Sequence, residues 1–262
     1  NQRRVEAERG VNTYWLKYPV RTGVGHRHSL RLEGGDQIFR YAAGVSYNDV
    51  AGAMKESNRK TFNGNVFLSY TNKGFTFQND LQVSVNRSYN SPYGTFSDFA
   101  KINSYWTPYD EQGTIVKILE NYKYISLSKE NFVYNPLYNA LLPSKDESRY
   151  TQIQNNFMAE WQILPELFVR ARLGITSRND RSDVYKSAKH TDFDGYSEEN
   201  YNRKGTYKYG TGESFSYEAD FTMNYTKTFA EKHQLYVGAS YSVAEEKSEE
   251  YRVLAEGISN VN

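Results

Sequence analysis

Hydrophobic residues occupy every second position over several stretches of this chain. In the clearest stretch, 152–176, the apolar face consists, apart from Asn155, of Ile153, Phe157, Ala159, Trp161, Ile163, Leu167, Val169, Ala171, Leu173 and Ile175. Alternating side chains lie on one face of an extended strand, so the pattern predicts two strands. Leu164-Pro165-Glu166 joins them, and proline suits a tight turn because its φ is fixed and it has no N–H to donate. The sequence therefore predicts a hairpin here.

The same alternation predicts three further hairpins. The eight predicted strands are 26–33, 38–47, 61–70, 75–86, 152–163, 167–176, 215–226 and 234–244. Short turns at 34–35, 73–74, 165 and 231–232 alternate with longer polar connections at 48–60, 88–150 and 177–214, and we expect a further loop from Glu245 onward. Tilted strands of about ten residues can cross a bilayer, and outer-membrane barrels have short turns at one end and long loops at the other.

These patterns predict an all-β fold: a segment of an antiparallel up-and-down transmembrane β-barrel with about eight strands in four hairpins and long extracellular loops. On this interpretation the whole of 1–262 belongs to one barrel domain.

Charge separates the two faces of the predicted strands. The apolar rows contain no Asp, Glu, Lys or Arg, whereas the opposite faces carry Arg40, Asp80, Glu160, Arg170, Arg172, Glu218 and Asp220, which we expect to face a polar lumen. A protein core would also exclude charge. Two alternatives therefore stay open: a soluble or surface-attached β-rich module that binds glycans, and a small self-contained outer-membrane barrel.

Composition excludes several other classes. The formal net charge is +1, so nothing favours nucleic acid as a partner. The absence of cysteine excludes disulfides and thiolate chemistry. Hydrophobic residues make up 38% of the chain, its mean hydropathy is -0.79, and no apolar run is long enough for a membrane-spanning helix.

An ordered series of short motifs carries a family resemblance. It comprises Asn12-Thr13-x-Trp15-Leu16, Pro19-x-Arg21-Thr22-Gly23, His28-x-Leu30, Gly34-Gly35, Ser57-Asn58-Arg59, Phe62-Asn63-Gly64-Asn65, Ser91-Pro92-Tyr93-Gly94 and Trp106-x-Pro108-Tyr109-Asp110-x-x-Gly113. The series resembles the SusC/RagA family of TonB-linked outer-membrane proteins. The resemblance is dense over 10–113 and only architectural afterwards.

The resemblance implies part of a barrel of about 22 strands around a plug domain. Such proteins import nutrients, either glycans or peptides, across the outer membrane of Gram-negative bacteria. They draw energy through TonB and work with a SusD-like lipoprotein lid. A TonB box, a plug and a closing C-terminal strand do not appear among these residues, so we expect a barrel-wall piece of a longer protein.

The first candidate site consists of aromatic residues in the 88–150 connection: Tyr89, Tyr93, Phe96, Tyr105, Trp106 and Tyr109. Rigid aromatic surfaces with polar tips suit contact with a sugar or a partner protein. The alternative is that they pack into a core of the loop itself.

Other candidates are weaker. His26 and His28 share a strand face but lack an evident third metal ligand, and Asp192-x-Asp194-Gly195 with Glu198-Glu199 matches only part of a calcium loop. We expect neither metal nor cofactor. No nucleophile or zinc-protease motif is present, so we expect a protein that is not an enzyme.

Overall fold

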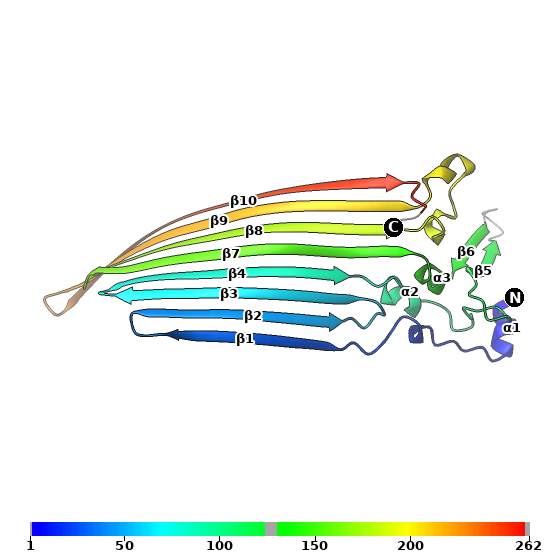
Figure 1. Cartoon of the computed structure of the whole chain (residues 1–262), viewed down its shortest axis with the longest axis horizontal. Helices are drawn as coiled ribbons and strands as arrows, with labels where there is room; N and C mark the ends of the chain where they lie inside the picture. Colours follow the sequence, from blue (N-terminus) through cyan, green and yellow to red (C-terminus); the bar gives the residue numbers. More distant parts are fainter. Residues whose placement is uncertain (1, 124–129, 260–262) are drawn as a thin grey trace.

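The computed structural model describes residues 2–123 and 130–259 and contains one large antiparallel sheet (Figure 1). Its strands are β1 Gly25–Gly35, β2 Phe39–Ala51, β3 Asn58–Asn72, β4 Phe75–Tyr89, β7 Ser144–Leu164, β8 Leu167–Lys186, β9 Thr206–Phe229 and β10 His233–Glu256. Neighbours in the sheet follow chain order, and within the described residues β1 and β10 each have one unpaired edge. The sheet is therefore an open segment of an up-and-down barrel, which confirms the predicted fold class.

Short and long connections between the strands lie at opposite ends of the sheet. The tight turns lie at one end of the sheet, and the connections 52–57, 90–143 and 187–205 lie at the other, together with the N-terminal segment (Figure 1). At the β3–β4 turn Lys73 has φ 46° and Gly74 has φ 78°. Two consecutive left-handed residues form the turn whose twist suits an antiparallel hairpin, and glycine adopts that conformation without steric cost.

The strands extend further than the alternation predicted. β7 begins at Ser144, β8 ends at Lys186, and β10 continues to Glu256, so the predicted loops 48–60, 88–150 and 177–214 were too long and the loop expected from Glu245 is wrong. In these extensions both faces carry polar residues. The ladder of backbone hydrogen bonds continues there without the hydrophobic alternation that reveals a strand in a sequence.

The strand register gathers the apolar rows onto one face. A single row of paired residues runs Ala43, Val66, Leu81, Asn155, Ile175 and Tyr217 across β2 to β9. Directly paired residues of antiparallel strands point to the same side of the sheet. Because every strand pair keeps this register, the predicted apolar rows form one continuous surface, which we call the apolar face.

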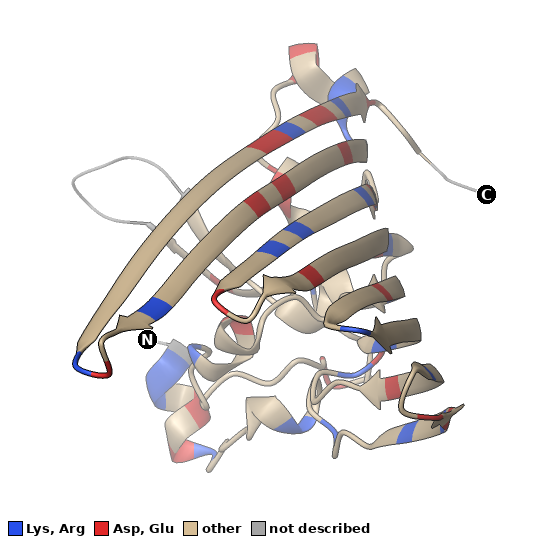
Figure 2. Cartoon of the chain, turned by 90° about the vertical axis from the view of Figure 1, so that its left-hand side faces the viewer, with Lys and Arg blue, Asp and Glu red and all other residues tan. Residues whose placement is uncertain are grey.

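The apolar face is the more exposed one. Tyr41, Val45 and Ile153 are each 47% exposed, whereas Ala42 and Ser69 on the opposite face are 4% and 8% exposed. Side chains converge on the inside of a curved wall and diverge on its outside, and Figure 2 shows the curvature of the sheet. No second layer of the described residues covers the apolar face, and none of the helices described is long and apolar enough to span a membrane.

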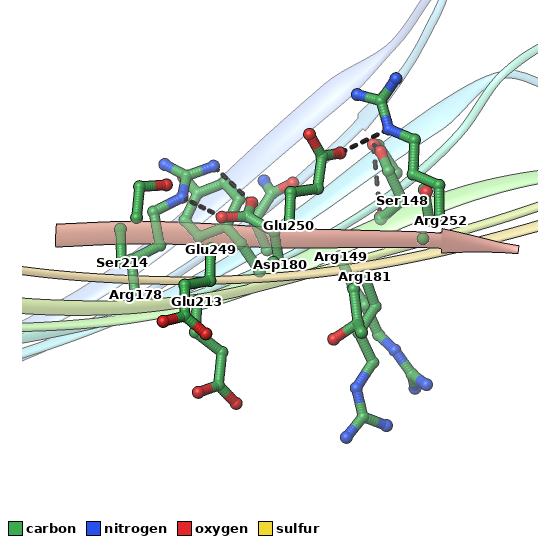
Figure 3. A pocket seen from close by; sticks show the side chains of 18 of the residues that line it. Ser148, Arg149, Arg178, Asp180, Arg181, Glu213, Ser214, Glu249, Glu250 and Arg252 are labelled. Atoms are coloured by element: carbon green, nitrogen blue, oxygen red, sulfur yellow. Dashed lines mark hydrogen bonds and ion pairs between the residues drawn. The ribbon is translucent and has the colours of Figure 1, made fainter.

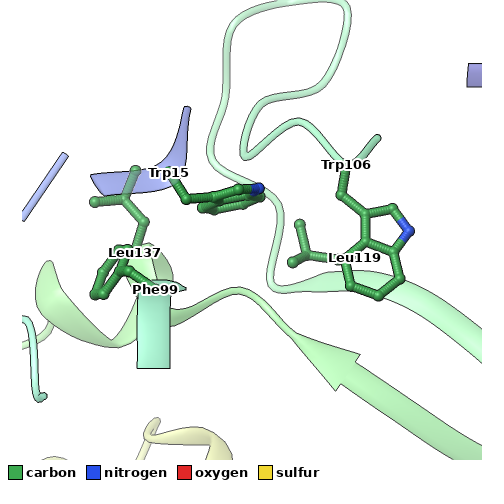
Figure 4. Close-up of a cluster of buried hydrophobic side chains, with 5 residues drawn as sticks. All are labelled: Trp15, Phe99, Trp106, Leu119 and Leu137. Atoms are coloured by element: carbon green, nitrogen blue, oxygen red, sulfur yellow. The ribbon is translucent and has the colours of Figure 1, made fainter. Parts of the chain in front are cut away.

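A small core forms beyond the loop end of the sheet (Figure 4). It consists of Trp15, Phe99, Trp106, Leu119 and Leu137. These residues come from the N-terminal segment, which holds α1 (Gln2–Glu8) and η1 (Trp15–Lys17), and from the β4–β7 connection, which holds α2 (Phe96–Ala100), β5 (Ile118–Lys123), β6 (Glu130–Tyr134) and α3 (Pro136–Ala140). Trp15 donates a hydrogen bond from Nε1 to the carbonyl oxygen of Asn103 at 3.0 Å, tying the two segments together.

Candidate functional site

The inner, concave face carries opposite charges on neighbouring strands. Arg170 on β8 donates from Nε to Oε1 of Glu160 on β7 at 2.5 Å. Arg172 donates from Nε to Oδ1 of Asp220 on β9 at 2.9 Å. Cross-strand partners of opposite charge stabilise a sheet, whereas like charges in the same place would weaken it. The sequence predicted these four residues for the polar face, and the structure brings them together as two ion pairs.

The remaining predicted lumen residues also lie on this face. Asp80 on β4 shares a register row with Glu218 on β9, and both line a hollow of about 400 Å³ with Asp220 and Arg172. Arg40 lies apart from them, near the β1–β2 turn, where its Nε donates to the carbonyl oxygen of Asp36 at 3.4 Å. The polar face therefore holds charges of both signs along most of its length.

A second hollow, of about 670 Å³, lies nearer the loops. Figure 3 shows residues that line it. Arg178 makes two hydrogen bonds to Asp180, at 2.7 and 2.8 Å, and its guanidinium lies 4.0 Å from the ring centre of Tyr150. Arg252 donates to Glu250 at 2.7 Å on the neighbouring part of β10. We call this second hollow the upper hollow.

The sequence pattern did not predict the upper hollow, because Arg178, Asp180, Glu250 and Arg252 fall in stretches that were predicted as loops. The only signal available was the local pairing of opposite charges two residues apart, as in Arg178-x-Asp180 and Glu250-x-Arg252. Such spacing places both side chains on one face once the segment is known to be a strand.

The aromatic candidates divide into buried and exposed sets. Trp106 is buried in the loop core, and Tyr93 and Tyr109 pack against it. Burial raises the pKa of the Tyr93 hydroxyl above its ordinary value. Phe96 and Tyr105 are exposed, at 53% and 42%.

Tyr89 lies at the end of β4, where the guanidinium of Arg87 is 5.0 Å from its ring centre. Contact of these aromatic residues with a substrate or a partner stays a prediction, and Phe96 and Tyr105 are the side chains placed to make it.

The histidines and carboxylates considered as metal ligands contact protein side chains. The rings of His26 and His28 are 5.2 Å apart, and the described residues contain no group of three or more His, Cys, Asp or Glu placed to hold a metal ion. Asp194 accepts a hydrogen bond from Lys117 at 2.5 Å, and Asp192 accepts one from Lys186. Although burial opposes it, the Lys186 hydrogen bond and charge keep the pKa of Asp192 below its ordinary value.

Comparison with solved structures places the fold among transporter chains. A chain in the structure of the RagAB peptide transporter superposes with a TM-score of 0.72 at 18% identity, over 96% of this chain and 27% of that one. The RagAB peptide importer in its open-open and closed-closed states gives TM-scores of 0.62 and 0.59 at 18% identity, over 93% of this chain and 30% of those. At 18% identity, what this chain shares with these transporter chains is the fold.

The chain thus spans about 27–30% of the length of those transporter chains. No family model matches the sequence, and no curated protein matches it.

Proposed function

We propose that this chain forms part of the wall of an importer barrel in the outer membrane of a Gram-negative bacterium. In this proposal the apolar face meets lipid and the concave polar face lines the passage. The observation that carries the proposal is the inverted burial of the sheet, in which apolar side chains such as Val45 and Ile153 point outward and ion pairs such as Arg172–Asp220 lie inside. A soluble binding module would have to leave this apolar face in water.

The slope of the apolar band supports a membrane orientation. On β2 the outward apolar residues run from Phe39 to Tyr47 and centre on Ala43; on β10 they run from Leu235 to Val243 and centre on Ala239. The register row through Ala43 meets β10 at Glu245, six residues beyond Ala239 and six strands across the sheet.

This shift can be converted into an angle. At ~3.3 Å per residue and ~4.8 Å per strand, it is ~20 Å along the strands over ~29 Å across them. A horizontal band then requires strands tilted by about 35°, within the range of about 35–45° found in outer-membrane barrels.

The polar face suggests the substrate class. Both hollows offer carboxylates and guanidinium groups within a few residues of one another, and the upper hollow adds hydroxyls such as that of Ser148. Such a wall can hydrogen-bond a peptide backbone or the hydroxyls of an oligosaccharide without covalent chemistry. The neighbouring structures are described as a peptide transporter, so we place peptides first and oligosaccharides second. In this scheme TonB supplies the energy, and a SusD-like lipoprotein covers the loop end near Phe96 and Tyr105.

Site-directed blocking tests the passage. The chain has no cysteine of its own, so Ser182→Cys in the upper hollow and Asn179→Cys on the apolar side give single reactive thiols. A bulky membrane-impermeant maleimide on cells should abolish uptake of labelled peptides through the Ser182→Cys protein and leave the Asn179→Cys protein active. Equal uptake by both labelled proteins would reject the passage. An oligosaccharide uptake assay on the same cells decides between the two substrate classes.

A further inference from the structure

Four basic residues stand in one register row on the outward side of the sheet. Lys60 on β3 pairs with Arg87 on β4, Arg87 with Arg149 on β7, and Arg149 with Arg181 on β8. All four share the apolar face, because they lie an even number of positions from Phe62, Val85, Ile153 and Ile175 on uninterrupted ladders. We call this set the basic row. Like charges directly opposite one another destabilise a sheet unless something of opposite charge lies between them.

Only half of the basic row forms an ion pair within the described residues. Lys60 lies 3.6 Å from Asp49, and Arg87 lies 2.6 Å from Glu147. Among the described residues, Arg149 and Arg181 form no hydrogen bond or ion pair, and both are exposed. Arg149 interacts electrostatically with Glu147 and Asp183 in the row above, but these carboxylates already form ion pairs with Arg87 and Lys145. Two adjacent guanidinium groups are thus available for an external anion.

Figure 3 shows how these two arginines lie. Arg149 and Arg181 point together to the side of the sheet opposite Ser148 and Arg252. Both residues border the upper hollow, but their guanidinium groups therefore lie on the outer surface and not in the passage. Guanidinium groups bind phosphate oxygens through paired, charge-assisted hydrogen bonds, and two of them on neighbouring strands suit one phosphate.

The basic row adjoins the apolar band and rises away from it. On β3, Lys60 lies two residues beyond the apolar Phe62; on β8, Arg181 lies six residues beyond Ile175. With the ~35° tilt and ~3.3 Å per residue, Arg181 stands ~16 Å above the hydrocarbon edge at Ile175. Phospholipid headgroups add only about 5–8 Å on each side of the hydrocarbon. A headgroup that reaches from Lys60 to Arg181 must therefore be larger than that of a phospholipid.

We propose that Arg149 and Arg181, with Lys60 and Arg87 beside them, bind the phosphates of a glycolipid in the outer leaflet of the membrane. The acyl chains of this lipid cover the neighbouring apolar rows, and its phosphorylated sugars extend up the basic row. The inference rests on the proposed function, because it needs the apolar face to lie in lipid with the loops outside. It adds a lipid site on the outer surface, separate from the passage.

Binding of lipopolysaccharide to the full-length protein tests the site. Labelled lipopolysaccharide with a phosphorylated core is titrated against the protein in mild detergent, alongside the same material after chemical dephosphorylation and alongside phosphatidylglycerol. Removing both guanidinium groups by Arg149→Gln with Arg181→Gln should weaken binding of the phosphorylated form about tenfold or more. Arg149→Lys with Arg181→Lys should restore part of the affinity, since the charges return without the paired geometry.

A matched control removes the same charge elsewhere. Lys232→Gln with Lys247→Gln takes two positive charges from the β9–β10 turn and from β10, outside the basic row, and should leave the affinity unchanged. Equal affinity of wild type and the double arginine variant, or equal binding of phosphorylated and dephosphorylated material, would overturn the proposal. Stronger binding of phosphatidylglycerol than of lipopolysaccharide would also overturn it. So would a double arginine variant that still binds the lipid but no longer binds an acidic protein partner. The proposed function fails separately: a protein monodisperse without detergent is no membrane barrel.

Discussion

Arg172 and Asp220 face each other across β8 and β9 on the concave side of the sheet, with Nε and Oδ1 2.9 Å apart. The Asp220 side chain is 18% exposed, so its carboxylate depends on this partner more than a fully hydrated one would. The pair illustrates how the chain distributes its charge: opposite charges pair on the concave face, and the apolar rows of the outer face contain no charged residue.

Replacing Arg172 by alanine should therefore destabilise the barrel. The loss of a half-buried cross-strand pair costs about 1 kcal/mol of unfolding free energy. Urea unfolding of the detergent-solubilised protein measures it. Arg252→Ala removes an arginine that is 78% exposed and should change stability by less than about 0.5 kcal/mol. Equal losses in both variants would mean that Arg172–Asp220 has no special role.

A charge on the outer surface should cost more than one inside. Leu81 lies near the middle of the apolar band, and its chain neighbour Gln82 points to the polar face. Leu81→Arg should lower the unfolding free energy by about 2–4 kcal/mol, the cost of a basic residue at mid-bilayer, whereas Gln82→Arg should be nearly neutral. Folding yield into lipid vesicles and urea unfolding report both. A larger effect for Gln82→Arg would reverse the assignment of the faces.

The β9–β10 turn is strained and can be improved. Ala230 and Glu231 have φ of 49° and 59°, the left-handed region that favours asparagine and glycine. Ala230→Asn combined with Glu231→Gly keeps this turn and should stabilise the protein by about 1 kcal/mol. Thermal unfolding in detergent measures the gain. The same pair of changes at exposed strand positions, Ser240→Asn with Glu249→Gly, serves as the control and should give no stabilisation.

The 187–205 loop should loosen in mild acid. His190 caps η2 (Thr191–Phe193) by accepting a hydrogen bond at Nδ1 from the backbone N–H of Asp192 at 3.1 Å. Burial lowers the pKa of His190, outweighing the attraction of Asp192. The opened loop thus takes up a proton near pH ~6.5 and the closed loop only below it, so the stabilisation is present above pH ~6.5 and is lost as the pH falls toward the folded pKa.

Hydrogen exchange tests this loss, with rates corrected for their intrinsic pH dependence. Protection of 187–205 should fall on acidification in the wild type and stay constant in His190→Asn, which keeps a capping acceptor that does not titrate. Unchanged wild-type protection across pH ~6.5 would exclude His190 as the cause.

The alternation of residues such as Ile153, Phe157 and Trp161 was enough to predict the central parts of the strands, and the structure confirms the fold class. It failed where both faces meet water: around Ser148, Arg178 and Arg252 there is no hydrophobic contrast, so the strand extensions and the upper hollow were interpreted as loops. The loop core joins Trp15 to Phe99 and Trp106 across long sequence distances, which local patterns do not reveal. The basic row likewise appears only once the register of four strands is known.

Collision accessibility of spin labels along β7 shows directly which face of the sheet meets lipid. Single cysteines at Ile153, Gln154, Asn156, Phe157, Met158 and Ala159 are labelled in the membrane-reconstituted full-length protein, with molecular oxygen reporting lipid and a polar nickel complex reporting water. We expect an alternation of period two, with Ile153, Phe157 and Ala159 accessible to oxygen and Gln154, Asn156 and Met158 accessible to nickel. Nickel accessibility at all six positions, or the opposite alternation, would contradict it.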